Sequence, residues 1–124
     1  MKTILLNVIE ETVQIMYVEP DLQAYYKALD CDCIDIVERK IGGKFYDVMC
    51  DDEGLFREPQ KISAINDMGE PMFVGNLLFF NNDGQGDLVG LSDKDIEHIK
   101  KHIKKMYTYK YPNGYPMLTQ CEYR

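Results

Sequence analysis

Residues 34–50 read IDIVERKIGGKFYDVMC, and this stretch predicts a β-hairpin. Its two halves, 34–41 and 44–50, are strand-like runs rich in β-branched and aromatic residues. Only Gly42 and Gly43 separate them, and two glycines supply the positive φ angles that a tight two-residue turn requires. The acidic sequence 51–54 (DDEG) is typical of a turn and closes the second strand.

The segment before the hairpin predicts strand, strand and helix. Residues 12–18 (TVQIMYV) are β-branched and apolar and end at Pro20, so we expect a strand there, with an extra strand at 4–9. Asp21 can cap the following helix, whose apolar residues recur at the spacing of one helical face up to Leu29. We expect this helix to end near Asp30.

The segment after the hairpin predicts further elements of both kinds. We expect a short helix at 61–66 and a central strand at 72–80 (MFVGNLLFF), which is apolar on both alternations. A turn cluster leads to a brief strand at 88–90. Ser92 and Asp95 fit a capping box for a helix that runs to about Met106. The tyrosine-rich tail 107–124 is expected to form a final hairpin or to wrap the domain.

Length and composition give the fold class. A chain of 124 residues with 45% hydrophobic content can bury one core. We predict an α+β single domain spanning 1–124, with a mostly antiparallel sheet of about four to six strands and two main helices. The longest apolar run, 77–80, is four residues, far short of a membrane span. The first residues do not resemble a signal peptide, so we expect a cytoplasmic protein with reduced cysteines.

Charge is distributed unevenly along the chain. Residues 1–92 contain 17 Asp and Glu against seven Lys and Arg, a balance of −10, whereas residues 93–124 carry a balance of +3. Such a field attracts basic surfaces and disfavours bare nucleic acid. Lysines of the last helix and tyrosines of the tail are therefore interpreted as a solvated face beside a packed tail, without direct nucleic-acid binding.

Several short motifs occur in a fixed order: Val-Glu-Pro at 18–20, the two glycines at 42–43, the acidic turn at 51–54, Phe-Val-Gly at 73–75 and Gly-Leu-Ser-Asp at 90–93. This order resembles a family of small uncharacterised proteins of bacteriophages and bacterial mobile elements, over about residues 13–106. The resemblance implies a mobile-element origin. It carries over no catalytic residues.

One set of side chains has the composition of a metal site. Cys31 and Cys33 lie two residues apart, and His98 and His102 lie four apart on a predicted helix, so the four together could hold a tetrahedral zinc ion. Cys-x-Cys is an uncommon spacing for structural zinc. Reduced core cysteines and solvated histidines are the alternative interpretation, and no other cofactor is expected.

The sequence lacks the common catalytic motifs. Glu97 precedes His98, whereas the zinc-protease helix places a glutamate directly after its first histidine. No Gly-x-Ser-x-Gly occurs, and the glycines at 84 and 86 lack the third glycine of a dinucleotide site. We therefore expect a protein that is not an enzyme.

These observations favour a non-enzymatic inhibitor that binds a basic, nucleic-acid-handling surface of a host defence protein, such as a CRISPR effector nuclease. The alternatives are an anti-restriction protein, or a zinc-containing or small-ligand-binding protein, including a sponge for a signalling nucleotide. The predicted partner-binding residues are the carboxylates near the hairpin: Asp30, Asp32, Asp35, Glu38, Asp51, Asp52 and Glu53.

Overall fold

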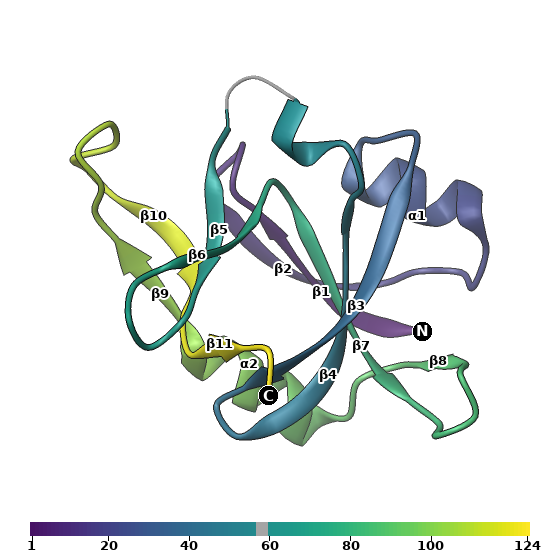
Figure 1. The fold of residues 1–124 in the computed structure, drawn as a ribbon. Helices are drawn as coiled ribbons and strands as arrows, with labels where there is room; N and C mark the ends of the chain where they lie inside the picture. Colours follow the sequence, from purple (N-terminus) through teal and green to yellow (C-terminus); the bar gives the residue numbers. More distant parts are fainter. Residues whose placement is uncertain (57–59) are drawn as a thin grey trace.

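Two β-sheets and two α-helices form the fold in this computed structural model, which describes residues 1–56 and 60–124 (Figure 1). The larger sheet has the order β11-β3-β4-β7-β1-β2, with β8 paired to β7, and the smaller sheet has the order β6-β5-β10-β9. The β5–β10 pair is parallel and the other pairs are antiparallel. The predicted α+β class is confirmed.

The larger sheet is built around the predicted hairpin. Its strands are β1 (Lys2–Asn7), β2 (Thr12–Tyr17), β3 (Ile34–Ile41), β4 (Lys44–Asp51), β7 (Leu77–Asn82), β8 (Leu88–Val89) and β11 (Cys121–Glu122). The hairpin register runs without interruption from Ile41 opposite Lys44 to Ile34 opposite Asp51. Gly42 and Gly43 both have positive φ angles, as the predicted turn requires.

The smaller sheet corrects two predictions. Its strands are β5 (Ile62–Ile65), β6 (Pro71–Val74), β9 (Ile103–Met106) and β10 (Tyr115–Leu118). The helix predicted at 61–66 was wrong: β5 has ladder partners on both sides, and this pairing outweighs local propensity. The single strand predicted at 72–80 was also wrong, because Gly75, with φ of 80°, divides the run between the two sheets.

The helices are α1 (Leu22–Leu29), the 3₁₀ turn η1 (Gly54–Phe56) and α2 (Asp93–His102). The predicted caps are confirmed: the Asp21 carboxylate accepts from the Ala24 amide at 2.8 Å, and Ser92 and Asp95 form a capping box. The predicted continuation of α2 to Met106 was wrong. The His102 carbonyl accepts from the Thr119 amide at 2.8 Å, and residues 103–106 pair with β10 instead.

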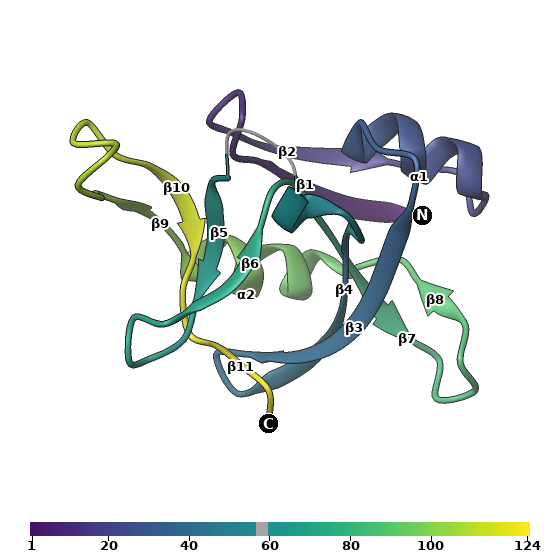
Figure 2. The same cartoon turned by 45° about the horizontal axis from the view of Figure 1, so that its top comes forward.

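The larger sheet separates two hydrophobic clusters. Side chains of Leu6, Val48 and Phe79 lie between the two sheets and α2, whereas the neighbouring Met49 and Phe80 face α1. We predicted one sheet of about four to six strands, whereas the described residues form eleven strands in two sheets of seven and four. Figure 2 shows α2 crossing the end of the space between the sheets. No helix in the described parts of the chain could span a membrane.

Candidate protein-binding site

Most of the predicted acidic residues meet at one end of the β3–β4 hairpin, opposite its glycine turn. The register places Asp35 opposite Cys50, and the Asp52 amide donates to the Cys33 carbonyl at 3.0 Å. The start of β3 and the end of β4 therefore bring residues 33–35 together with residues 50–52. In Figure 1 this end lies beside η1, while α2 lies at the other end of the molecule.

A hollow of about 340 Å³ opens at this acidic end. Its rim carries three carboxylates, those of Asp35, Asp51 and Asp52. Its wall is apolar, formed by Leu55 of η1 and by β6, and we call the whole the acidic hollow. The lining residues are Asp35, Cys50, Asp51, Asp52, Gly54, Leu55, Pro71, Met72, Phe73 and Val74.

Cys50 is the thiol of the acidic hollow, and it is neutral at physiological pH. Burial raises the pKa of Cys50 to about 11, and the neighbouring carboxylates of Asp35, Asp52 and Asp51 act in the same direction. The Arg39 guanidinium lowers this pKa by less. The thiolate form required of a nucleophile is therefore scarce at neutral pH.

A second hollow, of about 460 Å³, lies next to α1 and includes Asp30 and Asp32 in its lining. Asp30 is the C-cap of α1 and adopts a left-handed conformation, with φ of 53°. Asp32 precedes Cys33, whose carbonyl accepts from the Asp52 amide, so this hollow adjoins the acidic end of the hairpin. Glu53 lies in the turn there, where its amide donates to the Asp51 carboxylate at 2.9 Å.

Glu38 is separate from the other six predicted carboxylates. It lies in the middle of β3 opposite Asp47, and strand alternation places it on the other side of the sheet from Asp35. Glu38 lines a different hollow, of about 330 Å³, together with Lys44 and Phe45. The structure therefore places three of the seven predicted carboxylates at the acidic hollow, with Glu53 in the adjoining turn. Asp30 and Asp32 lie at the hollow next to α1, and Glu38 belongs to another surface.

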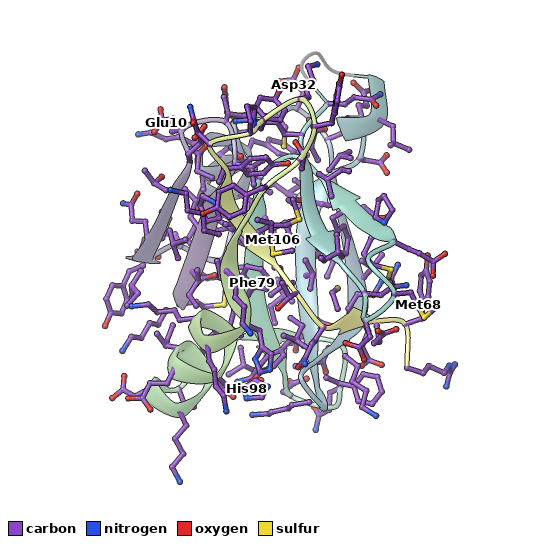
Figure 3. All side chains as sticks on the ribbon, turned by 90° about the vertical axis from the view of Figure 1, so that its left-hand side faces the viewer. Glu10, Asp32, Met68, Phe79, His98 and Met106 are labelled. Carbon is purple, nitrogen blue, oxygen red and sulfur yellow. The ribbon has the colours of Figure 1, made fainter. Side chains whose placement is uncertain are left out.

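The predicted zinc ligands are not brought together. Cys31 packs in the cluster under α1, and Figure 3 shows the neighbouring Asp32 at the opposite end of the molecule from His98. His98 Nε2 donates to the Ile41 carbonyl at 2.7 Å, and His102 Nδ1 donates to the His98 carbonyl at 2.8 Å. Among residues 1–56 and 60–124, no three His, Cys, Asp or Glu side chains are grouped as metal ligands.

The apolar wall of the acidic hollow and one neighbouring cation were not predicted. Arg39 lies 5.5 Å from the Phe73 ring centre and 4.5 Å from that of Tyr123, and its buried Nε has no hydrogen-bond partner among the described residues. The alternation of β3 places Arg39 on the side of Asp35. The alternation along this strand could be read from the sequence. The contacts of Arg39 with Phe73 and Tyr123 could not, because those residues are distant in the chain.

Comparison with protein-family models gives a match. A model described as a domain of unknown function (DUF3846) matches residues 1–104. No curated protein and no solved structure matches the chain. The match includes β1 and ends before β10, although β10 lies between β5 and β9 in the smaller sheet. Because the match covers more than half of the 124 residues, the chain belongs to the DUF3846 family.

Proposed function

We propose that the protein is a non-enzymatic binding protein whose acidic end docks on a basic surface of another protein. One observation carries this proposal: two strand ends, those of β3 and β4, contribute the carboxylates of Asp35, Asp51 and Asp52 to a hollow with an apolar wall. Lys and Arg side chains match such a hollow, because their aliphatic stems pack on apolar groups while their charged heads reach carboxylates. A basic protein surface presents many of these side chains at once.

The partner we propose is a host defence protein with a basic nucleic-acid-binding surface, in the cytoplasm of a bacterial cell. A CRISPR effector nuclease is the leading candidate and a restriction nuclease the alternative. Support comes from the −10 balance of residues 1–92 and from the resemblance to mobile-element proteins. A surface that binds phosphates would accept a row of carboxylates in their place.

The charge of the hollow favours a protein cation over a signalling nucleotide. The rim residues Asp35, Asp51 and Asp52 are carboxylates, and a nucleotide phosphate would be repelled by them. Arg39 lies near the hollow, but one guanidinium does not offset three carboxylates. The two histidines lie at the opposite end, where His98 Nε2 donates to the Ile41 carbonyl.

A charge-neutralising variant tests the proposal. The triple variant Asp35→Asn, Asp51→Asn, Asp52→Asn removes the rim charge, and we expect its affinity for the target nuclease to fall by about tenfold or more. The matched control is Asp87→Asn, Asp93→Asn, Glu97→Gln, which changes the net charge equally at exposed positions elsewhere.

Binding and inhibition are measured against purified CRISPR effectors and restriction nucleases, at low salt and near 1 M salt. At 1 M salt the Debye screening length is about 3 Å. The proposal predicts binding that salt weakens and that only the rim variant loses. Equal affinities for the two triple variants would show that the acidic hollow is not the binding surface. Absence of binding to every nuclease at low salt would refute the proposed partner class.

A further inference from the structure

The strand β2 forms an open edge of the larger sheet. It pairs with β1 on one side, and no strand in the described parts of the chain pairs with its other side. Figure 2 shows β2 at the margin of the molecule, with β1 beneath it. Its backbone can therefore accept a further strand.

The register identifies which residues of β2 present this edge. Met1 and Val18 exchange both main-chain bonds, at 2.7 and 2.9 Å. In an antiparallel ladder, bonded and non-bonded pairs alternate, so the N–H and C=O groups of Val13, Ile15 and Tyr17 point away from β1. The same three residues expose apolar side chains, at 36%, 45% and 74%. Outward backbone groups and exposed apolar side chains thus coincide.

The edge of β2 lacks the features that usually block strand addition. It contains no lysine, no proline and no irregularity in its register with β1. One edge strand of the smaller sheet, β9, is different, because Lys104 and Lys105 are exposed on it. The edge of β9 is therefore protected by charge, whereas the edge of β2 is not.

The charges around β2 indicate what would bind there. Residues 3–26 contain four carboxylates, Glu10, Glu11, Glu19 and Asp21, and no Lys or Arg. These carboxylates flank both ends of an apolar strand, and although Glu11 also forms an ion pair with Lys61 at 3.5 Å, four carboxylates against one lysine leave the flanks acidic. We infer that β2 binds an extended segment of a partner protein by strand addition, and that this segment has alternating apolar residues between basic ends.

A second copy of the chain fits this edge less well. Two copies could pair through β2 in an antiparallel, two-fold arrangement. Only the register centred on Ile15 pairs all three outward residues, with Ile15 opposite Ile15 and Val13 opposite Tyr17 of the other copy. That arrangement places the acidic turn before β2 of one copy, with Glu10 and Glu11, near the acidic segment after β2 of the other, with Glu19 and Asp21. Like charges that lie close to each other destabilise a strand pair. The segment with basic ends replaces both repulsions with attractions.

A synthetic peptide tests the inference. The probe is fluorescein-labelled Lys-Lys-Thr-Val-Thr-Ile-Thr-Val-Lys-Lys, and its control carries Glu at the four Lys positions. Fluorescence anisotropy measures affinity for the full chain. Amide hydrogen exchange, followed by NMR, reports whether the N–H groups of Val13, Ile15 and Tyr17 become protected.

Variants locate the binding edge. Ile15→Lys places a charge on the edge, and Ile15→Pro removes an outward N–H without breaking a bond to β1. Phe45→Lys is the matched control, because Phe45 is also 45% exposed but lies on the inner strand β4. We expect both Ile15 variants to weaken binding of the basic peptide by about tenfold or more, and Phe45→Lys to leave it unchanged.

Three results would overturn the inference. These are no binding of the basic peptide by the wild-type chain, binding that Ile15→Lys does not weaken, and a wild-type dimer in sedimentation that Ile15→Lys dissociates. The inference is independent of the acidic hollow. The triple variant Asp35→Asn, Asp51→Asn, Asp52→Asn should retain peptide binding, so the two proposals can fail separately.

Discussion

At the residue scale, Asp95 connects α2 to the larger sheet. Its side chain is buried, 3% exposed, and accepts hydrogen bonds from Tyr46 Oη at 2.9 Å, Asn81 Nδ2 at 2.6 Å and Ser92 Oγ at 2.7 Å, besides an ion pair with Lys44. Burial raises the pKa of this carboxyl, but the four donors outweigh burial and hold it well below its usual range. The ionised form is therefore the one that stabilises the fold.

We predict that Asp95→Asn lowers the free energy of unfolding by about 3 kcal/mol at pH 7, because the amide cannot replace a carboxylate that accepts from four donors. Urea unfolding measures the change. Because the pKa of Asp95 is lower in the folded than in the unfolded protein, its ionised carboxylate stabilises the fold above the unfolded pKa of about 3.9, and this stabilisation is lost as pH falls. The difference in free energy of unfolding between wild type and Asp95→Asn should therefore narrow below about pH 4. Asp93→Asn, in the same turn but exposed, is the control and should change little.

Gly42 carries a second residue-scale prediction. A Cβ atom at this position would lie 2.3 Å from the His102 ring, and φ is +52°. We expect Gly42→Ala to destabilise the fold by about 2 kcal/mol or more, through both the clash and the backbone strain.

A double-mutant cycle with His102→Ala separates the two effects on Gly42→Ala. In that background only the backbone strain remains, so the cost of Gly42→Ala should fall by about 1 kcal/mol or more. An unchanged cost would mean that the hairpin turn does not pack on His102. At Gly43, nothing lies within 4 Å of an added Cβ, so Gly43→Ala reports strain alone.

At the element scale, the sequence predicted what is set by local rules. The Gly42-Gly43 hairpin and the caps at Asp21 and Ser92 were correct because turns and caps depend on residues close in the chain. The β5 strand was predicted as helix because its structure depends on pairing with β10, which is distant in sequence. The β9 strand was predicted as a continuation of α2 because its residues continue the apolar spacing of that helix, whereas they pair with β10.

The candidate site also combines features that the sequence predicted with features that depend on distant residues. Its carboxylates were recognised from composition. Its apolar wall was not, because Leu55 and residues 72–74 meet the end of β4 only through tertiary packing.

The tail supplies the element-scale prediction. The family match ends at residue 104, but β10 contributes the buried Tyr115, Met117 and Leu118 to the main core. We predict that deletion of residues 107–124 abolishes cooperative thermal unfolding, because this deletion removes the strand between β5 and β9. Near-UV circular dichroism during heating measures the transition. Deletion of Arg124 alone is the control and should preserve the transition, and a cooperative transition in the long deletion would refute the prediction.

At the scale of the whole molecule, acidic residues and histidines lie at opposite ends. Figure 3 shows Glu10 and Asp32 at one end and His98, on the lysine-rich helix α2, at the other. The hollow next to α1, which Asp32 lines, and the turn before β2, which contains Glu10, therefore present negative charge from the same end. A partner with one basic surface can contact both.

The same separation predicts how the four thiols behave. Cys33 is exposed, Cys31 and Cys121 are buried and Cys50 is half-buried, while burial raises the pKa of Cys121 to about 12. We expect one thiol to react rapidly with Ellman's reagent at pH 8 in the folded protein, and four after denaturation.

A zinc ion shared by Cys31, Cys33, His98 and His102 would instead protect Cys33 until a chelator was added. Because these pairs lie at opposite ends, we expect EDTA to change neither the fast-reacting thiol nor the Tm. Stoichiometric zinc in the purified protein, together with a chelator-dependent increase in Cys33 reactivity, would contradict this arrangement.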